Sequence, residues 1–131
     1  MRVYEIDIVP MGCVRMTRYG KFKDKYAQRY LANKAQVQFT WQKQHKGDLL
    51  KGPLEVNLIF SMPIPKNGRS QNRKVASGDW HTTKPDSDNL QKSAFDAANK
   101  IVWEDDNQVC KVSCIKVYGD VPGIRMEVRE L

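Results

Sequence analysis

The apolar residues of this chain follow two different spacings, and their alternation restricts the folds it can adopt. In residues 2–9 they recur at every second position, as Tyr4, Ile6 and Ile8, and residues 54–60 repeat this pattern. Side chains that alternate in this way share one side of a β-strand, whereas apolar steps of three and four share one side of a helix. These two segments are therefore predicted to be strands of one sheet.

Two other segments have helical spacing. Residues 24–46 lack proline and glycine and place apolar residues among Lys, Gln and Arg, which favours an amphipathic helix. From Leu90 to Val102 the apolar residues recur at steps of three and four, which predicts a helix of about four turns that Ser87 or Asp88 can cap. Two closing strands, at residues 109–118 and 124–130, are expected around a turn that contains Pro122.

Together these elements predict an α+β fold, a single small domain over residues 1–131 with a mixed β-sheet packed against two main helices. No window approaches the roughly 18 apolar residues of a membrane span, and the first residues lack the apolar run of a secretion signal. We therefore expect a cytoplasmic protein without membrane association. The odd number of cysteines (Cys13, Cys110 and Cys114) favours reduced thiols over disulfides or a zinc site.

The formal net charge of +7 predicts a polyanionic partner. Basic residues are concentrated in residues 15–29 and in a segment at about 66–84, which is rich in Gly, Ser and Asn and cannot bury much apolar surface. The second segment is predicted to be a mobile basic loop that can embrace nucleic acid. A solvated charged face, or a merely disordered loop, would explain the same composition.

Carboxylates cluster where the second helix is expected to begin. Asp86 and Asp88 stand one residue apart, and Asp88, Lys92 and Asp96 follow at four-residue intervals that share a helix face. Acidic residues at 104–106 follow the end of this helix, where the chain can return toward the first pair. Carboxylate oxygens are the ligands that magnesium prefers, and a metal nuclease would use them to hydrolyse a phosphodiester. Taken singly, each acid favours a structural role as a helix cap or a polar turn, and Lys92 could form ordinary ion pairs within the helix.

Three consecutive blocks give this acidic region a specific order and spacing. They are Lys84-Pro85-Asp86-Ser87-Asp88-Asn89-Leu90-Gln91-Lys92, Phe95-Asp96-Ala97 and Val102-Trp103-Glu104-Asp105-Asp106-Asn107-Gln108-Val109. The blocks resemble the RusA family of Holliday junction resolvases, the crossover junction endodeoxyribonucleases. The close resemblance covers about 26 residues, and a looser one extends to the first strand, to Pro10 and residues 15–18, and to the closing strands.

The resemblance implies a RusA-like fold and a homodimeric endonuclease of recombination and repair, often carried by phages and prophages. Such an enzyme makes paired symmetric nicks across four-way junction DNA with Mg2+, for which Mn2+ is a candidate substitute. Matched residue by residue, Asp86, Asp88 and Asp106 correspond to the family's catalytic, metal-binding aspartates and Lys92 to its essential lysine. Because the connection from Asp96 to Trp103 is about one residue shorter than in the family, Asp105 stays an alternative to Asp106.

The resemblance also gives the basic residues a role, since phosphate contacts position a protein on DNA with little base readout. The expected phosphate contacts are Arg15, Arg18, Lys66, Arg69, Arg73, Lys74 and Lys84. Trp80 and His81 precede the acidic motif, where either can stack on an exposed base or shield the site. Trp41 and Trp103 are expected in the core.

Two other functions remain open from the sequence. A nuclease for flaps, forks or other branched DNA would use the same residues with a different loop geometry. A catalytically silent DNA-binding protein would use the basic segments alone, with the acids serving only as caps and turns. Asp86→Asn separates the classes, because it should abolish cleavage in an enzyme and leave a binding protein intact.

Overall fold

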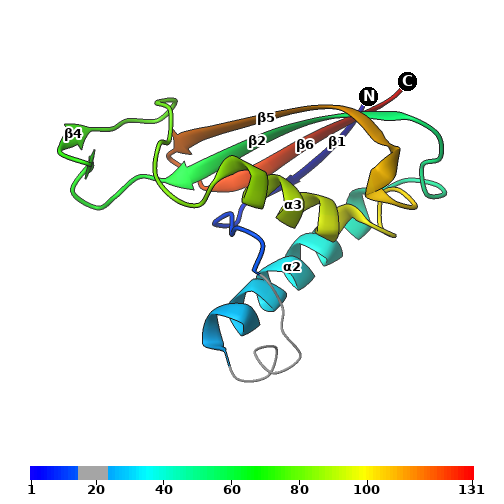
Figure 1. Ribbon diagram of the computed structural model, residues 1–131, viewed down its shortest axis with the longest axis horizontal. Helices are drawn as coiled ribbons and strands as arrows, with labels where there is room; N and C mark the ends of the chain where they lie inside the picture. Colours follow the sequence, from blue (N-terminus) through cyan, green and yellow to red (C-terminus); the bar gives the residue numbers. More distant parts are fainter. Residues whose placement is uncertain (15–23) are drawn as a thin grey trace.

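A mixed sheet of four strands forms the frame of the computed structural model, which describes residues 1–14 and 24–131 (Figure 1). The strands lie in the order β1 (Arg2–Ile6), β6 (Gly123–Glu130), β2 (Leu54–Pro63) and β5 (Val109–Gly119). β6 is antiparallel to both of its neighbours, and β5 is parallel to β2. The predicted mixed sheet is confirmed.

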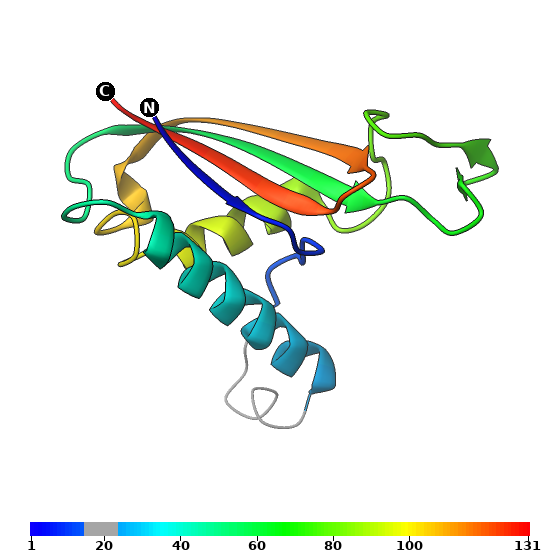
Figure 2. The ribbon, with the colours of Figure 1, turned by 180° about the vertical axis from the view of Figure 1, so that it is seen from behind.

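Among the described residues, α2 (Lys25–Gln44) and α3 (Ser87–Ala98) cover the same face of this sheet, as the two opposite views show (Figures 1 and 2). α2 begins after Asp24, whose carboxylate accepts a 2.8 Å hydrogen bond from the Tyr26 backbone N–H. It packs on β1 and on α3, while α3 packs on β5. The predicted α+β class is confirmed, and within the described ranges no helix combines the length and apolarity needed to cross a membrane.

The period-two pattern of β2 separates its two faces as predicted. Leu54, Val56, Leu58 and Phe60 are buried against the helices. Glu55 alternates onto the opposite face, which no helix covers, and its carboxylate is nevertheless almost fully buried. Lys111, 3.1 Å away, and Arg129 both pair with this carboxylate and hold its pKa below the usual range.

The second helix is shorter than its apolar spacing predicts. α3 ends at Ala98, and Lys100 adopts a positive φ of 64°. This left-handed turn lets the Lys100 N–H donate to the Trp103 carbonyl at 2.8 Å and brings the Trp103 indole N–H to the Asn99 side chain at 2.8 Å. Trp103 is thereby fully buried, as is Trp41, so both tryptophans are core residues as expected.

The basic segment at 66–84 contains more structure than an irregular loop. Two short strands, β3 (Arg69–Ser70) and β4 (Arg73–Lys74), form a hairpin that projects beyond the end of the main sheet (Figure 1). Residues 78–81 then return along β5, where the His81 N–H donates to the Lys116 carbonyl at 3.1 Å. The mobility of this segment stays a prediction, but its last part is hydrogen-bonded to the sheet.

Candidate active site

A lysine of β5 anchors the entrance to α3, which is the segment of residues 83–88. Lys116 donates from Nζ to the backbone carbonyls of Thr83 at 2.6 Å and Pro85 at 2.7 Å. Burial lowers the pKa of Lys116, and the nearby Asp86 carboxylate opposes this shift. The segment that carries Asp86 is therefore fixed by two charge-assisted hydrogen bonds.

Asp86, rather than Ser87 or Asp88, is the residue at the N-cap of α3, so the expected cap was wrong. Its backbone is extended, with φ −68° and ψ 150°, but its side chain makes no capping hydrogen bond. Asp88 lies in the first helical turn. Both carboxylates are exposed. They are thus open to a ligand instead of being consumed as caps.

Lys92 lies one turn beyond Asp88 on α3. Its ammonium is 3.7 Å from Asp96, and the Lys92 side chain is 63% exposed. The Asp96 carboxylate also accepts a weak hydrogen bond from the Cys13 thiol at 3.7 Å. An exposed ion pair of this kind contributes little to stability, so Lys92 can exchange its partner for a phosphate at small cost.

Asp105 and Asp106 have different environments. The Asp105 carboxylate caps the short 3-10 helix η1 (Asp106–Gln108), accepting a 3.0 Å hydrogen bond from the Asn107 N–H, which lowers the pKa of Asp105. The pKa of Asp106 is raised, first by burial and then by the neighbouring Asp105 and Asp96 carboxylates, with Lys92 acting in the opposite direction. Asp105 therefore has a structural role, whereas Asp106 is a crowded carboxyl group that a cation would relieve.

The acidic residues form two groups at opposite ends of α3. The helix begins near the end of β2 and leads toward η1 (Figure 1). Asp86 and Asp96 are ten residues apart, or about 15 Å along the helix axis. Asp106 is close enough to Asp96 for the charge of Asp96 to raise its pKa. Accordingly, among residues 1–14 and 24–131 no three His, Cys, Asp or Glu side chains are close enough to hold one metal ion. A single chain brings Asp86 close to Asp88 and Asp106 close to Lys92, but does not unite the three predicted ligands.

Comparison with known proteins identifies the family of this chain. The family model described as endodeoxyribonuclease RusA matches residues 5–129. The chain belongs to the RusA family. A curated relative, the uncharacterized protein YqaN of Bacillus subtilis (strain 168), is 32% identical over 147 positions, covering 92% of this chain and 99% of the relative. Membership implies an endodeoxyribonuclease of the general class that resolves Holliday junctions.

The basic residues expected at the DNA lie mainly beside the α3 entrance. Arg69, Arg73 and Lys74 belong to the β3–β4 hairpin, with Lys66 just before it, and all four are exposed. Lys84 is exposed next to Asp86. Arg15 and Arg18 lie outside the described residues. The hairpin thus presents positive charge beyond the sheet edge, on the same side as Asp86 (Figure 1).

Trp80 and His81 have opposite environments. Trp80 is exposed, so its stacking on a base stays a prediction. His81 is 9% exposed and packs on Tyr118 with 4.7 Å between ring centroids. Burial lowers the pKa of His81, and the charge of Lys116 adds to this effect. His81 is therefore a buried neutral imidazole rather than an exposed side chain of a mobile loop.

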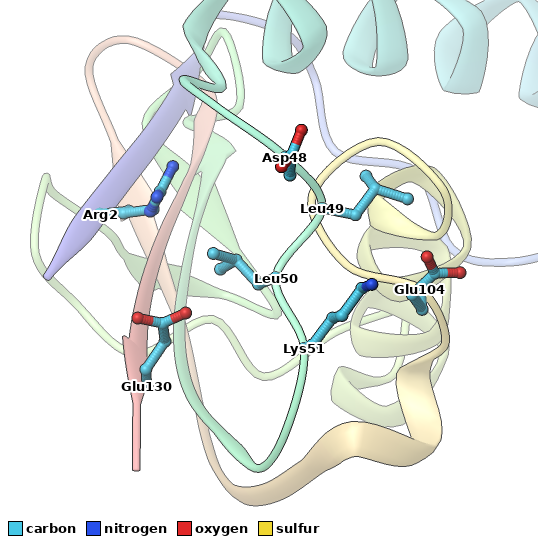
Figure 3. Close-up of a pocket in the computed structure, with 7 residues that line it drawn as sticks. All are labelled: Arg2, Asp48, Leu49, Leu50, Lys51, Glu104 and Glu130. Atoms are coloured by element: carbon cyan, nitrogen blue, oxygen red, sulfur yellow. The ribbon is translucent and has the colours of Figure 1, made fainter.

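Two hollows lie beside the α3 entrance. One of about 530 Å³ is lined by Gly12, Cys13, Lys84 and Asp86, and another of about 640 Å³ continues from Lys84 and Pro85 toward α2. A third hollow of about 670 Å³ lies at the other end of the molecule (Figure 3). Its lining mixes Arg2 and Lys51 with three carboxylates, which does not favour a phosphate chain. The hollows at Asp86 are the ones suited to DNA.

No role was predicted for Lys116 from the sequence. In the structure it contacts the segment just before α3, through the Thr83 and Pro85 carbonyls. A signal was present, because Lys116 alternates with Cys114 and Tyr118 on the strand face that is turned toward α3. A lysine in the buried register of a strand needs acceptors. Those acceptors are main-chain carbonyls some thirty residues earlier, which no local pattern predicts.

Proposed function

We propose that this protein is a Mg2+-dependent endodeoxyribonuclease that resolves four-way DNA junctions by paired symmetric nicks in recombination and repair. The observation that carries the proposal is the entrance to α3. Asp86 and Asp88 are exposed there, the Asp86 side chain makes no capping hydrogen bond, and Lys116 anchors the segment just before them. The match to the RusA family over residues 5–129 supports the same chemistry.

The donor set suits a hard divalent cation. Asp86, Asp88 and Asp106 would hold Mg2+, with Mn2+ as a substitute, because carboxylate oxygens are the preferred ligands of both. Asp106 is favoured over Asp105, since Asp105 is engaged as a cap, whereas the pKa of Asp106 is raised by burial and by the neighbouring Asp105 and Asp96 carboxylates, which a bound cation would offset. When bound, the ion supplies Lewis acidity toward the phosphate and toward an attacking water.

Lys92 supplies a mobile positive charge to the substrate. Its ammonium pairs with Asp96 while the Lys92 side chain stays 63% exposed, and it stands one turn from Asp88 on the same helix face. Rotation toward a bound phosphate would neutralise charge that develops as the phosphodiester is attacked. The exposed cations of the hairpin, with Lys84, would bind the flanking phosphates without reading bases.

In a homodimer, carboxylates of two chains could form one metal site. Among the described residues of one chain, Asp86, Asp88 and Asp106 do not come together as a group that could hold an ion, so we propose that Asp106 of one chain completes the site of another. β5 is an edge strand, and within the described residues its hydrogen-bonded outer neighbours, 78–81, reach only the part near residues 116–118. Antiparallel pairing of two β5 edges would bring the start of one strand, just after Asp106, beside the α3 entrance of the other chain.

Mixing two inactive variants tests this arrangement. Asp86→Asn and Asp106→Asn chains, mixed under conditions of subunit exchange, would recover one intact site per heterodimer if the site is shared between chains. The mixture should then make single nicks, although each variant alone is inactive. A mixture that stays inactive while heterodimers form would place each metal site within one chain.

Cleavage of a labelled synthetic four-way junction tests the function itself. Linear duplex and a replication fork serve as comparison substrates, with Mg2+ or EDTA, for the wild type and Asp86→Asn. Paired symmetric nicks in the junction, lost with EDTA or in the variant, are the expected result. Faster cutting of the fork would indicate a nuclease for other branched DNA, and junction binding without cutting under any divalent metal would indicate a silent DNA-binding protein.

A further inference from the structure

An apolar groove runs from the α3 entrance toward α2. It encloses about 640 Å³, a size that accommodates a small organic ring system. Four segments form it: residues 8–12, the first half of α2, the chain around Met62 and the chain around Lys84. Among its lining residues are Pro10, Met11, Tyr26, Ala32, Met62 and His81.

This groove is continuous with the hollow at Asp86. Gly12, Tyr26, Lys84 and Pro85 line both. The two hollows are fixed against each other, because a Cβ added at Gly12 would come within 3.1 Å of Pro85, and the Cys13 N–H donates to the Asn89 carbonyl at 3.0 Å. A ligand that reaches Asp86 can therefore extend into the groove without any movement of the backbone.

The lining chemistry is that of a nucleobase site. Pro10, Met11 and Met62 offer apolar contact, and Tyr26 offers an aromatic ring that is 46% exposed. The Arg29 guanidinium lies 5.4 Å from the centroid of that ring and also lines the groove. Stacking on aromatic and guanidinium planes is the common way in which proteins hold an unstacked base.

A mostly buried imidazole completes one side of this lining. The His81 ring lines the groove and packs on Tyr118, with 4.7 Å between the ring centroids. Its Nε2 lies 3.2 Å from the Thr83 hydroxyl. The ring therefore adds a flat, fixed surface to the groove.

We propose that the groove between residues 8–12, α2 and Lys84 binds one unstacked nucleobase next to the phosphate that is cut. The exposed cations Lys84 and Arg29 at its rim would meet the phosphates on either side of that nucleotide. The choice of a nucleobase over another apolar ligand rests on the proposed function, through the continuity with Asp86. The bases at the centre of a branched junction are the ones that unstack at least cost.

Binding without cleavage tests the groove independently of catalysis. Equilibrium dissociation constants are measured in EDTA for four-way junctions in which a single abasic site is moved, step by step, through the nucleotides around the crossover. Ala32→Phe fills the groove from an exposed position of α2. Ala35→Phe is the matched control, because Ala35 is exposed on the same helix and does not line the groove.

At one position the missing base should weaken wild-type binding about tenfold, the scale of a stacked base. Ala32→Phe should lose about as much on the intact junction and nothing further at the abasic position, whereas Ala35→Phe should behave as the wild type. If no position weakens wild-type binding, or if Ala32→Phe keeps the full abasic effect, the groove holds no base. A wild type that binds in this way but never cuts with Mg2+ would refute the proposed function and leave the groove standing.

Discussion

Replacement of Lys116 by methionine tests whether this lysine anchors the α3 entrance. The methionine keeps much of the apolar stem but removes both hydrogen bonds, to the Thr83 carbonyl at 2.6 Å and to the Pro85 carbonyl at 2.7 Å. The segment carrying Asp86 would then be held to β5 through residues 78–81 and through the weak hydrogen bond from the Cys114 thiol to the Ser87 carbonyl at 3.8 Å. Both the stability of the protein and its cleavage of DNA should decline.

The magnitude follows from the type of bond. A hydrogen bond from a charged donor contributes about 1.5–3 kcal/mol, and the partial exposure of Lys116 favours the lower end for each of the two. Part of that loss is offset, because the variant no longer buries an ammonium whose pKa burial already lowers. A net loss of about 2 kcal/mol in the free energy of unfolding is expected, which lowers the urea midpoint by about 1 M.

Urea unfolding in EDTA measures this change, and junction cleavage with Mg2+ measures its effect on the site. Lys111→Met on the same strand is the matched control, because Lys111 is exposed and its partner Glu55 keeps its pair with Arg129. That control should lose less than about 1 kcal/mol and cut normally. If Lys116→Met were no less stable than Lys111→Met and cut equally well, the two hydrogen bonds would not be what positions Asp86.

Three further substitutions test other parts of the site. Lys92→Ala should reduce cleavage strongly and change the unfolding free energy, followed by urea titration, by less than about 0.5 kcal/mol, because the Lys92 side chain stays 63% exposed in its ion pair with Asp96; a large loss of stability would contradict a substrate-directed role. Asp105→Ala should destabilise the protein by about 1 kcal/mol through loss of the η1 cap, and an unchanged melting temperature would refute that role. Asp106→Asn should be more stable than the wild type at neutral pH in EDTA. The pKa of Asp106 is raised by folding, so the wild type loses stability as pH rises through that pKa, and thermal unfolding should show the difference vanishing in acid.

The sequence predicted the elements well wherever one periodicity ran without interruption. The alternation in residues 54–60 identified which face of β2 is buried, and the long segment without glycine or proline identified α2 to within two residues at each end. The end of α3 was overestimated because Ile101 and Val102 continue the helical spacing from within a turn. The left-handed backbone of Lys100 permits that turn, and the burial of Trp103 accounts for it.

The candidate site was only partly predictable, for a related reason. Residue types and the family resemblance indicated Asp86, Asp88, Lys92 and Asp106, and the family itself is shown by the model match over residues 5–129. The order could not reveal that α3 separates the first two from the last by most of its length. Nor could it reveal the cap formed by Asp105 or the support given by Lys116, because both depend on main-chain groups that only the fold brings near.

The distribution of charge suggests how binding and cutting are kept apart. The exposed cations of the hairpin and of Lys84 attract phosphates whether or not a metal is bound, whereas Asp86 and Asp88 repel a phosphate until a cation joins them. Lys116 holds the segment that carries Asp86 in position through its hydrogen bonds to the Thr83 and Pro85 carbonyls. DNA affinity should therefore depend on salt and little on Mg2+, while cleavage requires the ion. The carboxylates would then control cleavage and contribute little to DNA affinity.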